Sequence, residues 1–515
     1  MFHNRVVGVA LLGLVLVLAA GTTGFAQQPA AGGTASPAAT SPKPQQATAT
    51  RPREPARGRP SKGERESSRK AYDEIIKAYG LYEDQSLQDY VSALGQRIAR
   101  NSDLPDEEFK FVVVDDDSIN AFTTGCCYIY VHRGLLLQLN SEAELASVLG
   151  HEIAHVTARH PSKRRNRSIL ASVLATGAAI ATGSGAVADL ANIGAGAWLQ
   201  GYGRDNELEA DRLGLLYSTR AGYRPEAMGE VFSMFKRGER FEIARARAEG
   251  REPRIYHGLF SSHPSPDQRS VQAAKGAAKI DGDPPGGWID NRSEYLKRMD
   301  GLVYGSSRTQ GIVRDNRFYH ADMGITLAFP RGWTVENQRE RLLAYTPSKD
   351  TFIQITVEPV PPGRSPREFL ATQLRGGTLI RGEAISSNGM DGYSAVTTSG
   401  SPIDGGAGPV RWIVLYRGSS AFVFGGASRS SRSGIPEADG LFQSVAETMR
   451  NLKPSEYPLA EPYRLRIKTA TASTRIEDSA ANMPVEKFQL EELLLINGLY
   501  PDKKPKPGDQ YKTVE

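Results

Sequence analysis

The sequence predicts a mixed α+β protein: a mainly helical domain with a small β-sheet, then an α+β domain and a small C-terminal module. Apolar residues recur at helical spacing around short β-rich runs between residues 67 and 280. They alternate in strand-like fashion between residues 316 and 453. The composition, 39% apolar and 23% charged over 515 residues, excludes fibrous and polytopic membrane proteins.

The net charge of +5 comes from one segment of the chain. Residues 27–62 carry six Lys and Arg side chains and one acidic side chain, so the remainder is close to neutral. A nucleic-acid-binding domain usually gathers basic residues on its folded surface. We therefore expect no nucleic-acid partner.

The first 26 residues have the pattern of a secretory signal peptide. Arg5 precedes an apolar run from Val6 to Ala20, and small residues at Gly24 and Ala26 mark a cleavage site. The run is shorter than the roughly 20 residues that span a membrane, which favours cleavage over the alternative, a single membrane anchor. We expect an exported protein, periplasmic or extracellular, with no transmembrane span after cleavage.

Residues 27–66 are rich in Pro, Ala, Thr and Gln and predict a disordered linker. The helical domain follows at 67–280. Its first clear helix has apolar residues at 4-3-4 spacing, which are Leu87, Val91, Leu94 and Ile98. β-Rich runs at 109–114 and 127–131 predict two strands. A capping-box pattern at Ser141 and Glu144 begins a long helix.

A connector at 281–315 leads to the α+β domain at 316–453, and a small module at 460–515 ends the chain. The predicted elements of the α+β domain are strands at 325–329, 352–357 and 412–416, a hairpin loop at 417–420, a helix capped by Ser365 and Glu368, and a helix at 436–452. The C-terminal module has a predicted strand at 465–468 and helix at 485–495. The α+β domain offers no catalytic cluster, so its role stays open.

The two cysteines, Cys126 and Cys127, are adjacent and cannot join distant elements. A disulfide between neighbours closes a strained ring, so we favour two small residues in a tight space. Stability must then come from packing.

His151, Glu152 and His155 form an HExxH motif inside the capped helix. Positions i and i+4 share a helical face, so both imidazoles can bind one Zn²⁺. Glu152 can take the proton of the zinc-bound water as it attacks a peptide carbonyl. The motif predicts a zinc peptidase site with one ion per chain. The alternative is a surface helix whose histidines face solvent.

A catalytic zinc ion usually has a third protein ligand and an open position for water. Glu207 and Asp211 lie four residues apart, on one helical face. One can bind zinc while the other orients a ligand histidine. Spacing alone does not decide between them, and Glu209 also competes.

HExxH followed at Glu207 by ExxAD resembles the gluzincin metallopeptidases of the HtpX and CAAX-prenyl-protease family. The resemblance is closest to its soluble, exported bacterial branch, which includes periplasmic chaperone-proteases for outer-membrane protein assembly. It covers about residues 67–280. Further matching motifs are Ile119–Phe122, a Tyr-Ile-Tyr-Val strand, Arg133–Leu136, Glu144–Gly150 and Ser262–Arg269.

The resemblance implies a role for each matching residue. His151, His155 and Glu207 bind zinc, and Glu152 is the general base. Asp211 supports a ligand or handles protons as a catalytic auxiliary.

Three further residues match the family less specifically. His263 corresponds to a loop histidine that approaches the metal as a removable ligand or transition-state stabiliser. Arg269 pairs with Asp211 or neutralises developing negative charge. A purely structural loop is the alternative for both. Asn120 contacts the substrate or the oxyanion, or forms a turn.

The chain departs from the family at Cys126 and Cys127, where other members carry two glycines. The resemblance places this pair just before the strand that pairs with an extended substrate, so bulkier residues narrow the cleft or make it redox-sensitive. Residues 168–198, rich in small apolar side chains, form a mobile lid or a pair of buried helices. Unchanged proteolysis within 165–203 when a zinc-binding inhibitor is added would count against a lid.

We expect an exported zinc metalloendopeptidase that hydrolyses misfolded or unassembled envelope proteins. The alternative is a protease-like chaperone or assembly factor for outer-membrane proteins with little turnover. A cell-wall-bound protein with structural zinc is disfavoured, because closed zinc sites usually use Cys ligands. Residues 460–515 resemble the LysM fold at Ile496–Leu499 and Lys506–Gly508, which implies cell-wall or envelope contact. A plain protein-contact module is the other interpretation.

Overall fold

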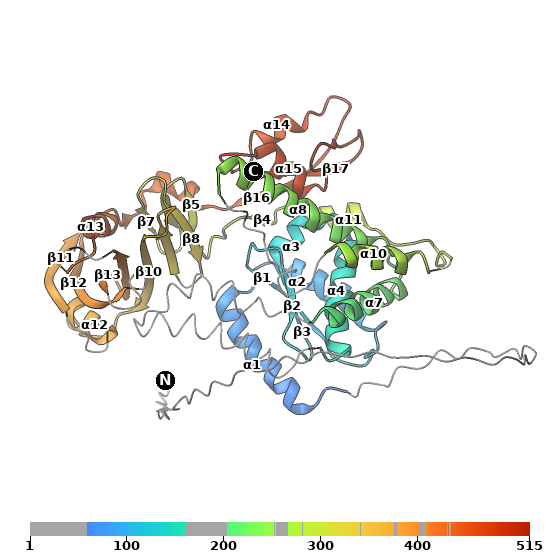
Figure 1. Cartoon of the computed structure of the whole chain (residues 1–515), viewed down its shortest axis with the longest axis horizontal. Coiled ribbons are helices and arrows are strands. Elements are labelled where there is room, and N and C mark those ends of the chain that lie inside the picture. Colours follow the sequence, from blue (N-terminus) through green and yellow to red (C-terminus); the bar gives the residue numbers. More distant parts are fainter. Residues whose placement is uncertain are drawn as a thin grey trace, which may run out of the picture. The chain divides into compact units, whose positions relative to one another are not determined.

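A computed structural model describes most of the chain after residue 58 (Figure 1). The described residues are 59–160, 203–251, 253, 266–280, 282–339, 341–374, 379–401, 403, 408–429, 431 and 434–515. The expected signal peptide, His263 and the expected lid at 168–198 lie outside them. Within them, no helix combines the length and the apolar character that crossing a membrane requires.

The first region is mainly helical, as expected, and contains a small sheet. Its elements are α1 (Lys62–Tyr79), α2 (Gln85–Ala99), β1 (Lys110–Val114), β2 (Ala121–Thr123), β3 (Tyr128–His132), α3 (Arg133–Gln138), α4 (Glu142–Thr157), α7 (Arg204–Arg220), α8 (Ala227–Glu249), α10 (Pro266–Ala277) and α11 (Arg292–Met299). Helix α1 begins inside the segment expected to be disordered, because Ser61 and Glu64 form a capping box. The sheet order is β1-β3-β2, with β3 parallel to β1 and antiparallel to β2.

One hydrophobic core joins this region to the segment expected to be a connector and to the end of the chain. In α11, Tyr295, Leu296 and Met299 are fully buried in that core. Strand β4 (Val303–Tyr304) pairs with β16 (Tyr463–Thr469). Residues 281–315 therefore contribute packing rather than merely linking two domains. Apolar spacing in so short a helix is too brief to reveal this.

The C-terminal unit has the order β16, α14 (Ile476–Ala480), α15 (Gln489–Ile496) and β17 (Gln510–Val514). Strands β16 and β17 are antiparallel. Helix α15 starts later than the expected residue 485. Its residues Leu493 and Ile496 enter the same core as α4 and α11.

The middle region is β-rich. Its elements are β5 (Ile312–Arg314), β6 (Arg317–His320), β7 (Ile325–Ala328), β8 (Thr334–Gln338), β9 (Arg341–Tyr345), β10 (Thr351–Pro359), α12 (Pro366–Gln373), β11 (Leu379–Ser387), β12 (Met390–Ser401), β13 (Gly408–Arg417), β14 (Ser420–Ser428), α13 (Asp439–Glu447), β15 (Arg450–Asn451) and the 3₁₀ helix η1 (Pro454–Ala460). The expected capping box of α12 and the expected hairpin after β13 are both present. The helix predicted at 436–452 is shorter, because its last residues form β15 and pair with β7.

Alternation along the long strands builds three layers in this region. In β13, Ile413 and Leu415 face a core shared with β6, β7 and α13, whereas Val414 faces α12. The seven-stranded sheet, in the order β11-β12-β13-β14-β10-β9-β8, therefore lies between α12 and the four-stranded sheet β15-β7-β6-β5.

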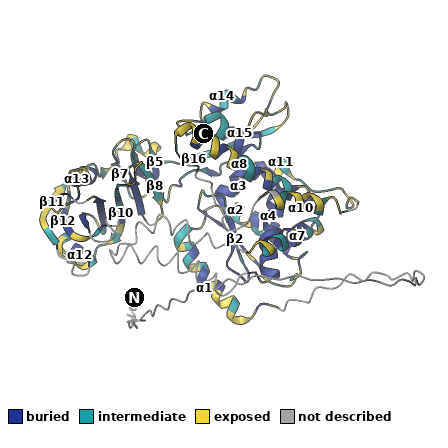
Figure 2. Ribbon diagram, in the orientation of Figure 1, coloured by how far each residue is buried: buried dark blue, intermediate teal, exposed yellow. Residues whose placement is uncertain are grey.

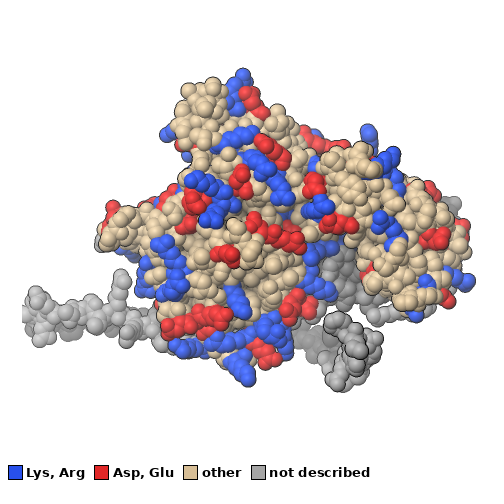
Figure 3. All heavy atoms as spheres, turned by 180° about the vertical axis from the view of Figure 1, so that it is seen from behind, with Lys and Arg blue, Asp and Glu red and all other residues tan. Residues whose placement is uncertain are grey.

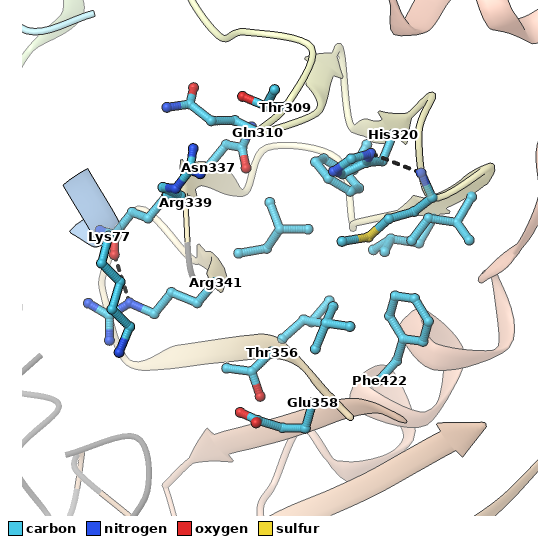
Figure 4. Close-up of a pocket in the computed structure, with 18 residues that line it drawn as sticks. Lys77, Thr309, Gln310, His320, Asn337, Arg339, Arg341, Thr356, Glu358 and Phe422 are labelled. Atoms are coloured by element: carbon cyan, nitrogen blue, oxygen red, sulfur yellow. Dashed lines mark hydrogen bonds between the residues drawn. The ribbon is translucent and has the colours of Figure 1, made fainter. Parts of the chain in front are cut away.

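A cavity of about 470 Å³ opens between these two sheets (Figure 4). Its lining includes the apolar side chains of Phe318, Ile355 and Phe422. It also includes polar and charged side chains, among them His320 and Arg341. The cavity therefore has both apolar and polar walls, at a distance in sequence from the HExxH helix.

Cys126 and Cys127 form a disulfide with each other across a cis peptide bond. This differs from the expected pair of small residues, although both side chains are buried as expected. Metal binding by cysteine needs a thiolate. The nearby Glu107 and this oxidised pair therefore do not form a metal site.

Acidic and basic side chains lie side by side over the face drawn in Figure 3. Among the described residues, partly exposed salt bridges include Arg308–Asp322, 14 residues apart, and Arg245–Glu492, 247 residues apart.

Candidate metal centre

Helix α4 carries the HExxH motif and is buried along all 16 residues (Figure 2). The Ser141 hydroxyl accepts a hydrogen bond from Glu144 N, as the capping pattern predicts. The Glu144 carboxylate, however, accepts from Asn140 N rather than from Ser141 N. The helix start is therefore fixed by two residues before Glu142.

A glycine pair sets the distance between α4 and α7. A Cβ on Gly150 would lie 2.7 Å from Gly214 O, and a Cβ on Gly214 would lie 2.7 Å from His151 N. No side chain fits at either position without movement of backbone. The close approach brings the carboxylates of α7 to the imidazoles of α4.

His151, His155 and Glu207 meet at one buried point. The two Nε2 atoms are 3.0 Å apart. Each lies 3.5 Å from a Glu207 carboxylate oxygen. None of the three residues is more than 4% exposed. The structure thus brings together the three residues predicted to bind zinc.

This geometry fits a tetrahedral zinc ion. Ligand atoms about 2.0–2.1 Å from such an ion lie about 3.3 Å from one another. The three observed separations are close to that value, and the donors are the two imidazoles and one carboxylate typical of catalytic zinc. Among the described residues, His151, His155 and Glu207 also form a candidate metal site because one ligand atom of each lies within 4.8 Å of the other two.

Asp211 lies on the other side of His151. Its Oδ1 is 3.0 Å from His151 Nδ1. Arg269, on α10, donates two hydrogen bonds of 2.7 and 2.6 Å to the same carboxylate. The Arg269 guanidinium also lies 3.6 Å from Glu207 and over the Phe232 ring. Of the two interactions the sequence suggested for Arg269, pairing with Asp211 is present.

Charge and burial act together on this group. Burial alone would lower the pKa of His151, but its contacts with Asp211 and Glu207 raise that pKa to about 9 when no metal is bound. Burial alone would raise the pKa of Asp211. The charge of Arg269 outweighs burial, and the pKa of Asp211 is lowered as a result. Asp211 is therefore an anion that can hold His151 in place.

Glu152 is 1% exposed and directly follows His151 in the chain. Its negative charge is among the charges that raise the pKa of Arg269, together with those of Asp211 and Glu207. A buried carboxylate beside the ligands is suited to proton transfer.

Asn120 lies just before β2, and its carbonyl accepts a hydrogen bond from His132 N. Strand β3 lies between β1 and β2 and is paired on both sides. The expectation that this strand pairs with substrate is therefore wrong. The edge strand beside α4 is β2.

Sequence reasoning did not single out His160. It lies five residues after His155, just beyond the end of α4, and its Nδ1 is 2.9 Å from His155 Nδ1. A third histidine so close behind an HExxH motif was the available signal. Glu209, considered as a competing ligand, instead contacts His160.

The comparisons with known proteins concern this same part of the chain. Residues 85–277 match the model of peptidase family M48. A putative beta-barrel assembly-enhancing protease of Vibrio cholerae is 37% identical over 160 residues, covering 29% of this chain and 33% of that protein. The beta-barrel assembly-enhancing protease of Escherichia coli K12 is 30% identical over 246 residues, 46% of each chain.

A mitochondrial metalloendopeptidase, OMA1 of Schizosaccharomyces pombe, is 29% identical over 213 residues, covering 40% of this chain and 58% of that protein. The chain thus spans less than two thirds of the length of each of these relatives. The matched segment contains α4, α7 and the whole of α10, and hence the whole His151, His155 and Glu207 group. This segment, less than half of the chain, is therefore the part that matches the M48 family of metallopeptidases.

Proposed function

We propose that the chain is an exported zinc metalloendopeptidase that hydrolyses peptide bonds in misfolded or unassembled envelope proteins. The observation that carries the proposal is the buried group of His151, His155 and Glu207 next to Glu152. The signal-like pattern of residues 1–26 supports export to the periplasm. The names of the bacterial relatives support outer-membrane β-barrel proteins as substrates.

In this proposal His151, His155 and Glu207 would hold the zinc ion. When bound, zinc would supply polarisation of the scissile carbonyl and a lower pKa for the attacking water. The Glu152 carboxylate would take the proton of the attacking water and deliver it to the leaving amine. The Asp211 carboxylate, held by Arg269, lies 3.0 Å from His151 Nδ1 and would keep Nε2 turned toward the ion.

The substrate backbone is proposed to pair with β2. This strand is the edge of the sheet on the side of α4. An exposed strand edge binds an extended peptide through main-chain hydrogen bonds. Asn120 lies at one end of β2, and the Cys126–Cys127 disulfide lies in the turn after it. These positions support a role for both in limiting which peptides fit.

Substitution of Glu152 by Gln tests the mechanism. We expect the full chain to keep its zinc but to lose about 10²- to 10⁴-fold in kcat for casein, since proton transfer is lost. Metal content and casein cleavage, each with and without chelator, are the measurements. An exposed carboxylate on α7 gives the control, Asp205→Asn, which should stay active. The proposal is refuted if Glu152→Gln cleaves casein as fast as wild type, or if the purified wild-type protein contains no zinc.

A protease-like chaperone is the second candidate function. The observation in its favour is the 470 Å³ cavity in the β-rich region, with walls both apolar and polar. A pocket of this size can hold a peptide side chain or a small ligand. If Glu152→Gln rescues the phenotype of a deletion strain, holding of clients rather than cleavage is the main role.

The C-terminal unit is proposed to contact the cell wall as a LysM-like module. Its strand-helix-helix-strand order and antiparallel strands support this interpretation. Failure of the full chain to sediment with purified peptidoglycan would leave it as a protein-contact unit.

A further inference from the structure

His160 is turned back toward the metal group by the chain that follows α4. Arg159 has a φ of 59°, in the left-handed region, and this reverses the backbone direction just after the helix. His160 N then donates to His155 O. As a result His160 Nδ1 lies 2.9 Å from His155 Nδ1, and the His160 side chain is only 3% exposed.

Glu209, on α7, contacts the other side of the His160 ring. Its Oε2 lies 2.9 Å from His160 Nε2. The Glu209 side chain is 22% exposed, so the carboxylate lies at the border of the buried group. One turn of α7 therefore supplies Glu207 to the metal group, Asp211 to His151 and Glu209 to His160.

The positions of the protons follow from these distances. His155 Nε2 faces His151 and Glu207, so as a metal ligand it carries no proton, and the neutral ring carries its proton on Nδ1. That N–H points at His160 Nδ1, which must therefore accept. The proton of neutral His160 is then on Nε2, where the Glu209 carboxylate accepts it.

We propose that His160 and Glu209 are positioning residues for the zinc ligand His155. They fix its tautomer and its ring orientation, as Asp211 and Arg269 do for His151. This inference rests on the zinc peptidase function proposed above. In this inference Glu209 orients His160 and does not bind the metal. His160 orients His155 and needs no contact with substrate.

Loss of either residue should weaken zinc binding. Partners that hold a ligand histidine from outside typically change metal affinity by 10- to 100-fold. His160→Leu leaves His155 Nδ1 without its acceptor and should show a loss in that range. Glu209→Leu should show a smaller loss, since the Glu209 carboxylate contacts His160, which in turn contacts His155.

Conservative variants separate positioning from packing. In His160→Gln the amide oxygen can accept from His155 while the amide nitrogen donates to Glu209, so zinc affinity should be partly restored relative to His160→Leu. Glu209→Gln should likewise bind zinc more tightly than Glu209→Leu. The double variant His160→Leu/Glu209→Leu should be no weaker than His160→Leu alone, because the two residues act in series.

The experiment is a zinc titration of the full chain against a competing fluorescent chelator, with thermal unfolding of the metal-free forms alongside. Asp205→Asn, on the exposed side of α7, is the matched control and should bind zinc like wild type. Equal zinc affinity of His160→Leu and wild type, or additive losses in the double variant, would overturn the inference. If His160→Leu does not fold, the Glu209 variants decide instead: equal zinc affinities of Glu209→Leu and Glu209→Gln would overturn the inference.

The same titration separates this inference from the proposed function. If wild type binds no zinc, the proposed function fails first. If wild type binds one equivalent and only the His160 and Glu209 variants behave contrary to expectation, the function stands and the positioning role does not.

Discussion

His151 makes the metal-free protein sensitive to pH. Its folded pKa is about 9, whereas an unfolded histidine titrates near 6.5. A raised folded pKa adds stability that is fully present below pH 6.5 and is lost as the pH rises through 9. The contribution is on the order of 3 kcal/mol. We expect the free energy of unfolding of chelator-treated protein to fall over this interval, as measured by urea denaturation.

Asp211→Asn provides the comparison for this prediction, because Asp211 is the carboxylate nearest His151 Nδ1. The variant should be less stable below pH 6.5 and should show a flatter pH dependence between 6.5 and 9. An unchanged slope would mean that another group titrates in this interval.

At the residue scale, local spacing predicted that the two histidines meet, whereas the choice of Glu207 as their carboxylate partner came from the family resemblance. The i, i+4 rule places His151 and His155 on one face, and the same rule applies to Glu207 and Asp211. Which carboxylate turns to the imidazole Nε2 atoms depends on the rotation of α7 against α4, which no local pattern encodes. The contact of His160 with His155 depends on a single left-handed residue, Arg159.

At the element scale, the contact between α4 and α7 depends on Gly214. In Gly214→Ala the new Cβ would lie 2.8 Å from His151 Cα and 2.7 Å from its nitrogen. Both are backbone atoms, so the helices must separate, at a cost of about 1–3 kcal/mol. We expect lower thermal stability and weaker zinc binding together, because Glu207 moves away from the imidazoles.

Gly238 in α8 gives a matched control, since a Cβ there meets no atom within 4 Å. Gly238→Ala should raise stability by about 0.5–1 kcal/mol through helix propensity and leave zinc affinity unchanged. Normal zinc affinity in Gly214→Ala would show that the helix separation does not control the site.

Elements with a long, regular pattern were predictable. Helix α2 and strands β1, β10 and β13 lie where apolar spacing placed them. Elements that depend on contacts with residues far away in the sequence could not be predicted. Residues 450–451 pair with β7 rather than extending α13, and α11 is short and gains its stability from the core around α4.

At the scale of the whole molecule, the last residues of the chain support the start of the HExxH helix. Lys512 is fully buried and donates to the carbonyl oxygens of Leu137, Leu139 and Ile496 at 2.6, 2.6 and 2.9 Å. Arg292 bridges the same parts, with hydrogen bonds to Asn140 O and Gln510 O. Residues 137–140 directly precede α4, so side chains of Lys512 and Arg292 hold the segment from which the HExxH helix starts.

Lys512→Met tests whether the position of α4 depends on the hydrogen bonds of Lys512. A methionine fills a similar volume but leaves up to three buried carbonyls without their donor, at about 1–3 kcal/mol for each. We expect a lower unfolding free energy and a reduced zinc affinity, measured by urea denaturation and chelator competition. Lys504→Met removes only an exposed ion pair with Glu477 and should change stability by less than about 1 kcal/mol. Wild-type behaviour of Lys512→Met would mean that α4 keeps its position without the hydrogen bonds of Lys512.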